Sequence, residues 1–172
     1  MARGVEDLRT GYRTGTITPT QAVDDCLKAI DALEANIGAW VAVYADDARE
    51  AAKRATEELT RRLAEGTEDE LGDFFGIPYA LKDIVDVEGH VTTGGCAERK
   101  EHVATETATI AKRLEGAGGI LIGKVKTVEF AMGAWYDSRS EIDIGNDGTT
   151  ESLDLRCTLC TPQPPSLMAR FA

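Results

Sequence analysis

Long hydrophobic runs are missing from the 172-residue sequence. No stretch of about 18 consecutive apolar residues occurs, so a transmembrane helix is not expected. The first residues, from Met1 to Asp7, also lack the apolar run of a secretory signal. Because nothing in the sequence directs export, we expect a cytoplasmic protein with no membrane partner.

Positive charge is also scarce. The chain has 19 Lys and Arg residues against 30 Asp and Glu residues, which gives a formal net charge of −11. This charge repels phosphate backbones and anionic lipids, so nucleic acid is not an expected partner. Hydrophobic residues nevertheless make up 42% of the chain, which is enough for one folded domain with its own core.

Histidine and cysteine are few, and this limits metal chemistry. Cys157 and Cys160 form the single CxxC motif, and a zinc site would need two more ligands. The plausible donors are Cys96, His90 and His102. Ordinary small hydrophobic or loop cysteines explain the same residues more simply. We therefore expect no metal and no cofactor.

Helix and strand signals fill the first 66 residues. Residues 18–21 read Thr-Pro-Thr-Gln, which is a capping box with proline at the first helical position. A helical period of apolar residues follows and stops at Gly38. Residues 40–44 are a short apolar run typical of a strand. An alanine-rich stripe then predicts a second helix that ends at Gly66.

The next part of the chain predicts a strand, a helix and a second strand. The strands are residues 77–85 and 119–123, and the helix is residues 107–117. At this spacing the three form a βαβ unit, so the two strands should be parallel. Thr127 is expected to cap a further short helix. The predicted fold class is therefore α/β.

Lys82 is the candidate functional residue. It lies next to Asp83 at the carboxyl end of a predicted strand, where the loops of α/β sheets often bind ligands. A lysine in an apolar setting is desolvated, its pKa falls, and it can serve as a general base. From position alone, however, the simpler interpretation is a lysine that leaves a strand for solvent.

Several ordered motifs change that interpretation. Residues 76–83 read Gly-Ile-Pro-Tyr-Ala-Leu-Lys-Asp, and residues 92–95 read Thr-Thr-Gly-Gly. They are followed by Arg-Leu-Glu-Gly-Ala-Gly at 113–118, Gly-Lys at 123–124 and Glu-Phe-Ala-Met-Gly at 129–133. In this order and spacing, the motifs resemble the amidase signature family.

The resemblance covers residues of about 5–134 and implies an incomplete amidase-signature fold, with N-terminal helices and a βαβ unit of a mixed sheet. It also implies hydrolysis of the carbon–nitrogen bond of a small-molecule amide by a lysine, a bridging serine with a cis peptide, and a nucleophilic serine. Lys82 matches the catalytic lysine, which passes protons through the bridging serine while an acyl-enzyme forms. Lys124, Thr92 and Thr93 match framework positions without a catalytic role.

The serines of this triad are absent from their expected context. By the resemblance, the bridging serine belongs in a Gly-Ser-rich loop near residues 152–162. Ser152 lies there without glycine neighbours, and Ser166 lies among prolines. We therefore predict that this chain alone has no amidase activity. Whether Ser152 or Ser166 has any role stays open.

The character of the sequence changes after about residue 135. We predict that residues 1–135 are the N-terminal portion of an amidase domain and that residues 136–172 are a divergent, poorly ordered tail. Out-of-frame translation of a disrupted gene would explain the change, and so would a short protein that lost catalysis. The alternatives are a non-catalytic partner-binding protein and a fragment of an amidotransferase A-type subunit. Exposed sheet edges further predict self-association.

Overall fold

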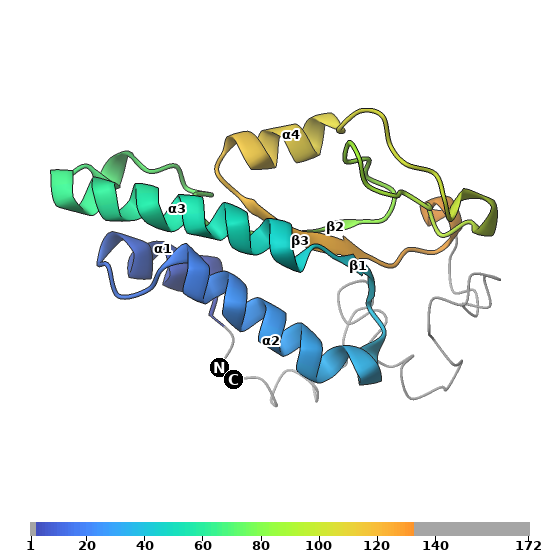
Figure 1. Ribbon diagram of the computed structural model, residues 1–172, viewed down its shortest axis with the longest axis horizontal. Helices are drawn as coiled ribbons and strands as arrows, with labels where there is room; N and C mark the ends of the chain where they lie inside the picture. Colours follow the sequence, from blue (N-terminus) through green and yellow to red (C-terminus); the bar gives the residue numbers. More distant parts are fainter. Residues whose placement is uncertain (1–2, 133–172) are drawn as a thin grey trace, which may run out of the picture.

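The computed structural model describes residues 3–132, and they form a mixed α/β fold (Figure 1). The expected fold class is therefore confirmed. Single turns of 3-10 helix lie at Glu68–Glu70, Ala97–Arg99 and Glu129–Ala131. The helices and strands, in chain order, are α1 (Val5–Arg13), α2 (Pro19–Ile37), β1 (Trp40–Val43), α3 (Ala45–Glu65), β2 (Pro78–Lys82), α4 (Thr109–Gly116) and β3 (Ile120–Val125).

The three described strands form one sheet in the order β1-β3-β2. β2 and β3 are parallel, with Pro78 opposite Ile120 and Lys82 opposite Val125, and α4 lies between them in the chain. This confirms the predicted parallel pair and its connecting helix. β1 pairs antiparallel with β3. β3 is therefore the central strand, and β1 and β2 are the two edges of the described sheet.

The predicted start and end of α2 are confirmed in detail. The Thr18 side chain accepts a hydrogen bond from the Gln21 backbone N–H, and the Gln21 side chain accepts one from the Thr18 N–H. This reciprocal pair satisfies two N–H groups that the first turn of a helix leaves free. Gly38 ends the helix with φ of 59°, in the left-handed region that favours glycine.

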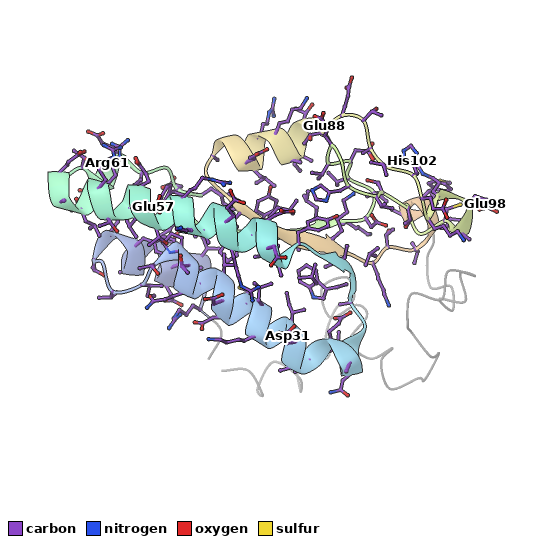
Figure 2. The ribbon with its side chains drawn as sticks, viewed as in Figure 1. Asp31, Glu57, Arg61, Glu88, Glu98 and His102 are labelled. Carbon is purple, nitrogen blue, oxygen red and sulfur yellow. The ribbon has the colours of Figure 1, made fainter. Side chains whose placement is uncertain are left out.

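Helices α2 and α3 pack on each other and cover one face of the sheet. Figure 1 shows α4, and the loop that leads to it, on the opposite side. The outer surfaces of α2 and α3 carry charged side chains such as Asp31, Glu57 and Arg61 (Figure 2). The main core joins these two helices to β3 and consists of Val23, Leu27, Ala48, Ala52, Ile120 and Ile122.

A second core cluster is built around α1, which the sequence patterns did not predict. Leu8 and Tyr12 of α1 pack with Leu59 and Ile77. The Tyr12 hydroxyl donates a hydrogen bond of 2.8 Å to the backbone carbonyl of Gly76. This bond holds α1 against the residues that lead into β2.

The short helix expected after Thr127 is not formed. The structure has only the single 3-10 turn Glu129–Ala131 there, and Phe130 and Ala131 have φ values of 48° and 56°. An α-helix cannot continue through residues with positive φ. The Thr127 hydroxyl instead donates to the Val128 carbonyl.

The predicted boundary near residue 135 and the tail 136–172 lie outside the described residues. Within residues 3–132, no helix is both long enough and apolar enough to cross a membrane.

Candidate active site at the carboxyl ends of β2 and β3

Lys82 is the last residue of β2, and its side chain is exposed. The residues on either side of it, Leu81 and Asp83, are buried, as the alternation of a strand dictates. The chain turns immediately afterwards, because the N–H groups of Ile84 and Val85 both donate to the Lys82 carbonyl. Lys82 therefore stands where the strand ends, on the face opposite to Asp83.

Asp83 is fully buried and extends the pairing of β2 with β3 by one residue. Its backbone N–H donates to the Val125 carbonyl at 2.9 Å. Its carboxylate atom Oδ2 accepts hydrogen bonds from the Thr93 backbone N–H at 3.1 Å and from the Thr93 hydroxyl at 2.5 Å. The carboxylate thus ties the loop after β2 to the strand end.

Lys124 of β3 is also fully buried, which sequence reasoning did not foresee. Its Nζ atom donates to the Val91 carbonyl at 2.8 Å and to the Thr92 hydroxyl. The same atom lies 3.7 Å from Asp83 Oδ1. The described residues provide no hydrogen bond to Asp83 Oδ1, so its interaction with Lys124 is the ion pair. Burial lowers the pKa of Lys124, and the nearby carboxylates of Asp83 and Asp86 oppose that change.

The motif at residues 92–95 closes the loop against the end of β3. Gly94 N–H donates to the Asp83 carbonyl, and Phe130 N–H donates to the Gly94 carbonyl. Gly95 has φ of 73°, and a Cβ atom there would lie 2.8 Å from the Thr127 carbonyl oxygen. Only glycine fits this approach without strain. The structure therefore brings the sequence motifs around residues 82, 93 and 124 together.

Apolar side chains remain exposed beside this strand end. Ile84, directly after the buried Asp83, is 43% exposed, and Phe130 is 48% exposed. Phe130 belongs to the segment that follows β3, and it is joined to Gly94 by a backbone hydrogen bond. Lys82 therefore shares its end of the sheet with apolar surface as well as solvent.

A groove of about 400 Å³ lies elsewhere, between α3, α4 and the sheet. The rings of Tyr44 and His90 contact each other in its wall, with centroids 4.1 Å apart and planes inclined by 36°. Burial raises the pKa of Tyr44 to about 12, with smaller contributions from Asp83 and Asp47. Lys82 is not among the lining residues, so the groove and the strand end are separate features.

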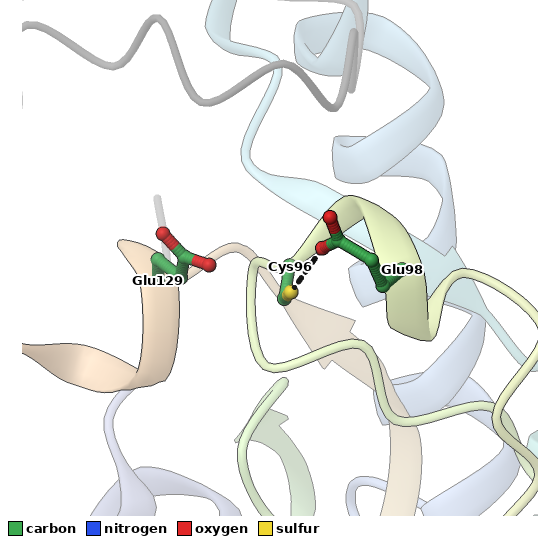
Figure 3. A group of neighbouring side chains, drawn as sticks. All are labelled: Cys96, Glu98 and Glu129. Atoms are coloured by element: carbon green, nitrogen blue, oxygen red, sulfur yellow. Dashed lines mark hydrogen bonds between the residues drawn. The ribbon is translucent and has the colours of Figure 1, made fainter.

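The residues considered for a metal are not brought together as the sequence suggested. Cys157 and Cys160 lie outside the described residues, the His90 ring contacts the Tyr44 ring, and His102 is exposed. Within residues 3–132, the structure instead gathers the possible ligand atoms of Cys96, Glu98 and Glu129 within 4.8 Å of one another (Figure 3).

The thiol in this group is hydrogen-bonded to a carboxylate. Cys96 Sγ donates to Glu98 Oε2 at 2.8 Å. That hydrogen bond, followed by burial, raises the pKa of the Cys96 thiol. Because a metal ligand must be the thiolate, this environment disfavours the form that binds a metal. Glu98 and Glu129 are exposed carboxylates.

The sequence of this chain matches proteins of one known family. The family model described as Amidase matches residues 21–140. Over 131 residues the chain is 35% identical to the A-type subunit of the glutamyl-tRNA(Gln) amidotransferase of Anaeromyxobacter dehalogenans (strain 2CP-C), and the match covers 76% of this chain and 25% of that protein. It is 30% identical over 123 residues to an acylamidase of Rhodococcus erythropolis, covering 72% of this chain and 24% of that protein.

Comparison with solved structures finds the same fold over a similar share of the chain. A protein of a vestigial complex, described as revealing the origins of an s-triazine catabolic enzyme, matches with a TM-score of 0.70 and 25% identity. The match covers 80% of this chain and 29% of that protein. The chain thus spans about a quarter of the length of the curated relatives it matches.

Proposed function

The chain belongs to the amidase signature family, and from that premise we propose that it carries the lysine-bearing part of a site that hydrolyses amide carbon–nitrogen bonds. The observation that supports this proposal is the position of Lys82. Its amine is exposed at the carboxyl ends of two parallel strands, while the adjacent Asp83 is buried in a bonded network. A reactive amine at this position is accessible, and the backbone that carries it is fixed.

Lys82 would act as the proton acceptor and donor of the reaction. The nucleophilic serine gives its proton, through the bridging serine, to the Lys82 amine, while its oxygen bonds to the amide carbon. The carbon–nitrogen bond then breaks, and the proton returns along the same path to the leaving amine. Water hydrolyses the acyl-enzyme in a second cycle of the same transfers. The substrate class is a small-molecule amide.

The 172 residues do not contain a recognisable pair of serines for this reaction. Ser152 and Ser166 lack glycine neighbours and lie outside the described residues. The chain also spans only about a quarter of its relatives. We therefore propose that this chain alone does not hydrolyse amides, and that Lys82 becomes catalytic only where the serine-bearing part of the fold is present.

A chimera tests this proposal. Residues 5–132 would replace the corresponding segment of the Rhodococcus erythropolis acylamidase, and hydrolysis of an aryl acylamide would be measured. We expect activity in the chimera, loss of at least about 100-fold on Lys82→Ala, and little change on Lys112→Ala, an exposed lysine of α4. A chimera that folds and hydrolyses equally well after Lys82→Ala would refute the role of Lys82.

A subunit of the amidotransferase A type is the second candidate. The observation in its favour is that several relatives at 33–37% identity are A-type subunits of glutamyl-tRNA(Gln) amidotransferases. A matching chimera with the Anaeromyxobacter protein separates the two candidates. If this candidate is correct, only that chimera will release ammonia from glutamine. If neither chimera shows Lys82-dependent activity, the non-catalytic, partner-binding alternative is favoured.

Self-association is a separate proposal about partners. The edges β1 and β2 of the described sheet leave one side of each strand without a partner strand. Such edges can pair with a second copy. Sedimentation at increasing concentration should then show a dimer, and a strictly monomeric chain would contradict this proposal.

A further inference from the structure

We propose that Asp83 and Lys124 are positioning residues for Lys82: their buried ion pair, with the hydrogen bonds around it, fixes the backbone at the end of β2. The proposal rests on the proposed role of Lys82 as the reactive amine. It assigns a task to Lys124, which the resemblance marked only as framework, and to Asp83, to which it gave no role.

Asp83 is attached to its surroundings at three points. It follows Lys82 directly, so whatever fixes Asp83 also fixes Lys82. The backbone of Asp83 is bonded to Val125 through its N–H and to Gly94 through its carbonyl. Its side chain is bonded to Thr93. Three separate attachments therefore hold the residue that follows the reactive lysine.

Lys124 completes the anchor from β3. Its Nζ atom reaches across to the loop at Val91 and Thr92 and to the carboxylate of Asp83. A charged amine with no solvent exposure is tolerated only if it is paired and hydrogen-bonded. The loop after β2 and the strand β3 are thus locked to each other by one side chain.

The ion pair makes the anchor depend on both partners. Removing either partner leaves the other charged group buried without its counter-charge, whereas removing both leaves no buried charge. The two single substitutions should therefore loosen the end of β2 more than the double substitution does.

The test uses the complete 172-residue chain and needs no hydrolytic activity. Backbone hydrogen exchange is measured by NMR for the original chain, for Asp83→Asn, for Lys124→Met and for the double variant. Exchange near the end of β2 should be faster in each single variant, and the double variant should lie closer to the original chain than either of them. Lys112→Met is the matched control at an exposed lysine of α4 and should leave this exchange unchanged.

The Gly94 N–H, which is bonded to the Asp83 carbonyl, reports local opening, and the Ile120 N–H at the other end of the strand pair reports global opening. The ratio of the Gly94 rate to the Ile120 rate should rise at least about tenfold in both single variants. If a single variant fails to fold, Thr93→Val removes the hydroxyl hydrogen bond to Asp83 and leaves the backbone hydrogen bond and the ion pair intact. It should speed Gly94 exchange relative to Ile120 exchange.

Two outcomes would overturn the proposal. Gly94 exchange that rises only in proportion to Ile120 exchange would show that the pair acts only by general loosening of the fold. Unchanged Gly94 exchange in the single variants would show that the pair does not hold the end of β2 at all. Neither outcome depends on whether the acylamidase chimera is active, so a failure of the proposed function would be recognised separately.

Discussion

Lys82 and Asp83 are neighbours in the chain, yet the Lys82 side chain is exposed on one face of β2 and the Asp83 carboxylate is fully buried on the other. The alternation of a strand places the two charges on opposite faces. This separates the two tasks of the Lys-Asp motif. One residue presents an amine, and the other ties the strand end to the loop at residues 92–95 and to β3.

Loss of the buried cation should be strongly destabilising. Lys124→Met leaves the Asp83 carboxylate buried without its partner, which costs about 3–5 kcal/mol of unfolding free energy. Urea denaturation measures this loss. The double variant with Asp83→Asn should lose less than the sum of the two single changes. An additive double variant would mean that the two residues are not energetically coupled.

Lys82→Ala should change the stability of this chain very little. The side chain is exposed at a strand end, so we expect a change below about 0.5 kcal/mol in unfolding free energy. The same urea experiment measures it. A loss well above that value would mean that the Lys82 side chain makes contacts that support the fold. Lys112→Ala is the matched control on an exposed position.

Alanine substitutions at two glycines can distinguish the cost of a strained backbone from the cost of a clash with the added Cβ atom. Gly95 and Gly89 have φ values of 73° and 79°, but only at Gly95 would a Cβ meet the Thr127 carbonyl oxygen, at 2.8 Å. Gly89→Ala should cost about 1 kcal/mol from the backbone alone, and Gly95→Ala about 2 kcal/mol or more. Equal losses in thermal or urea unfolding would show that the loop yields to the added methyl group.

The cap of α2 should contribute measurably to stability. Thr18→Ala removes the acceptor for the Gln21 N–H, and the expected loss is about 1 kcal/mol. Thr60→Ala, at an exposed position inside α3, is the control, because it removes a threonine without removing a cap. If both variants unfold at the same denaturant concentration as the original chain, the cap has no energetic role.

Tyr44 should make stability fall at alkaline pH. Its pKa is raised by burial, then by Asp83 and Asp47, from the ordinary value of 10.0 to about 12. A group whose pKa is raised in the folded state adds to the free energy of unfolding. This contribution is complete below the pKa of the unfolded state and is lost as the pH rises through the pKa of the folded state. Stability should therefore decline between pH 10 and about 12, and Tyr44→Phe should reduce the decline. Identical pH profiles for both proteins would contradict this assignment.

Local signals made much of the fold predictable. The capping box at residues 18–21 and the glycines at 38 and 66 give the boundaries of α2 and the end of α3 directly. The apolar, helical, apolar succession also predicts the parallel pair of β2 and β3. α1 was missed because its amphipathic pattern is short and its stability comes from distant partners, such as the Tyr12 bond to Gly76.

The candidate site was predictable only in part. Lys82 stood out by its motif, and its assignment as the reactive amine stays a prediction. The burial of Lys124 could not be read from its neighbours, since Gly-Lys at a strand end is equally typical of a solvated lysine. The partners that make burial possible, Val91, Thr92 and Asp83, come from segments that only the folded chain brings together.

The central place of β3 also sets the order in which the chain can assemble. β1 and β2 are both synthesised well before residue 120, but each pairs with β3 and not with the other. Until the ribosome has released β3, neither earlier strand has its partner in the described sheet, and only the helices and the cluster around α1 can form in advance. A nascent chain arrested before Ile120 should therefore be helical but without this sheet, and the arrival of β3 should trigger the cooperative step of its folding.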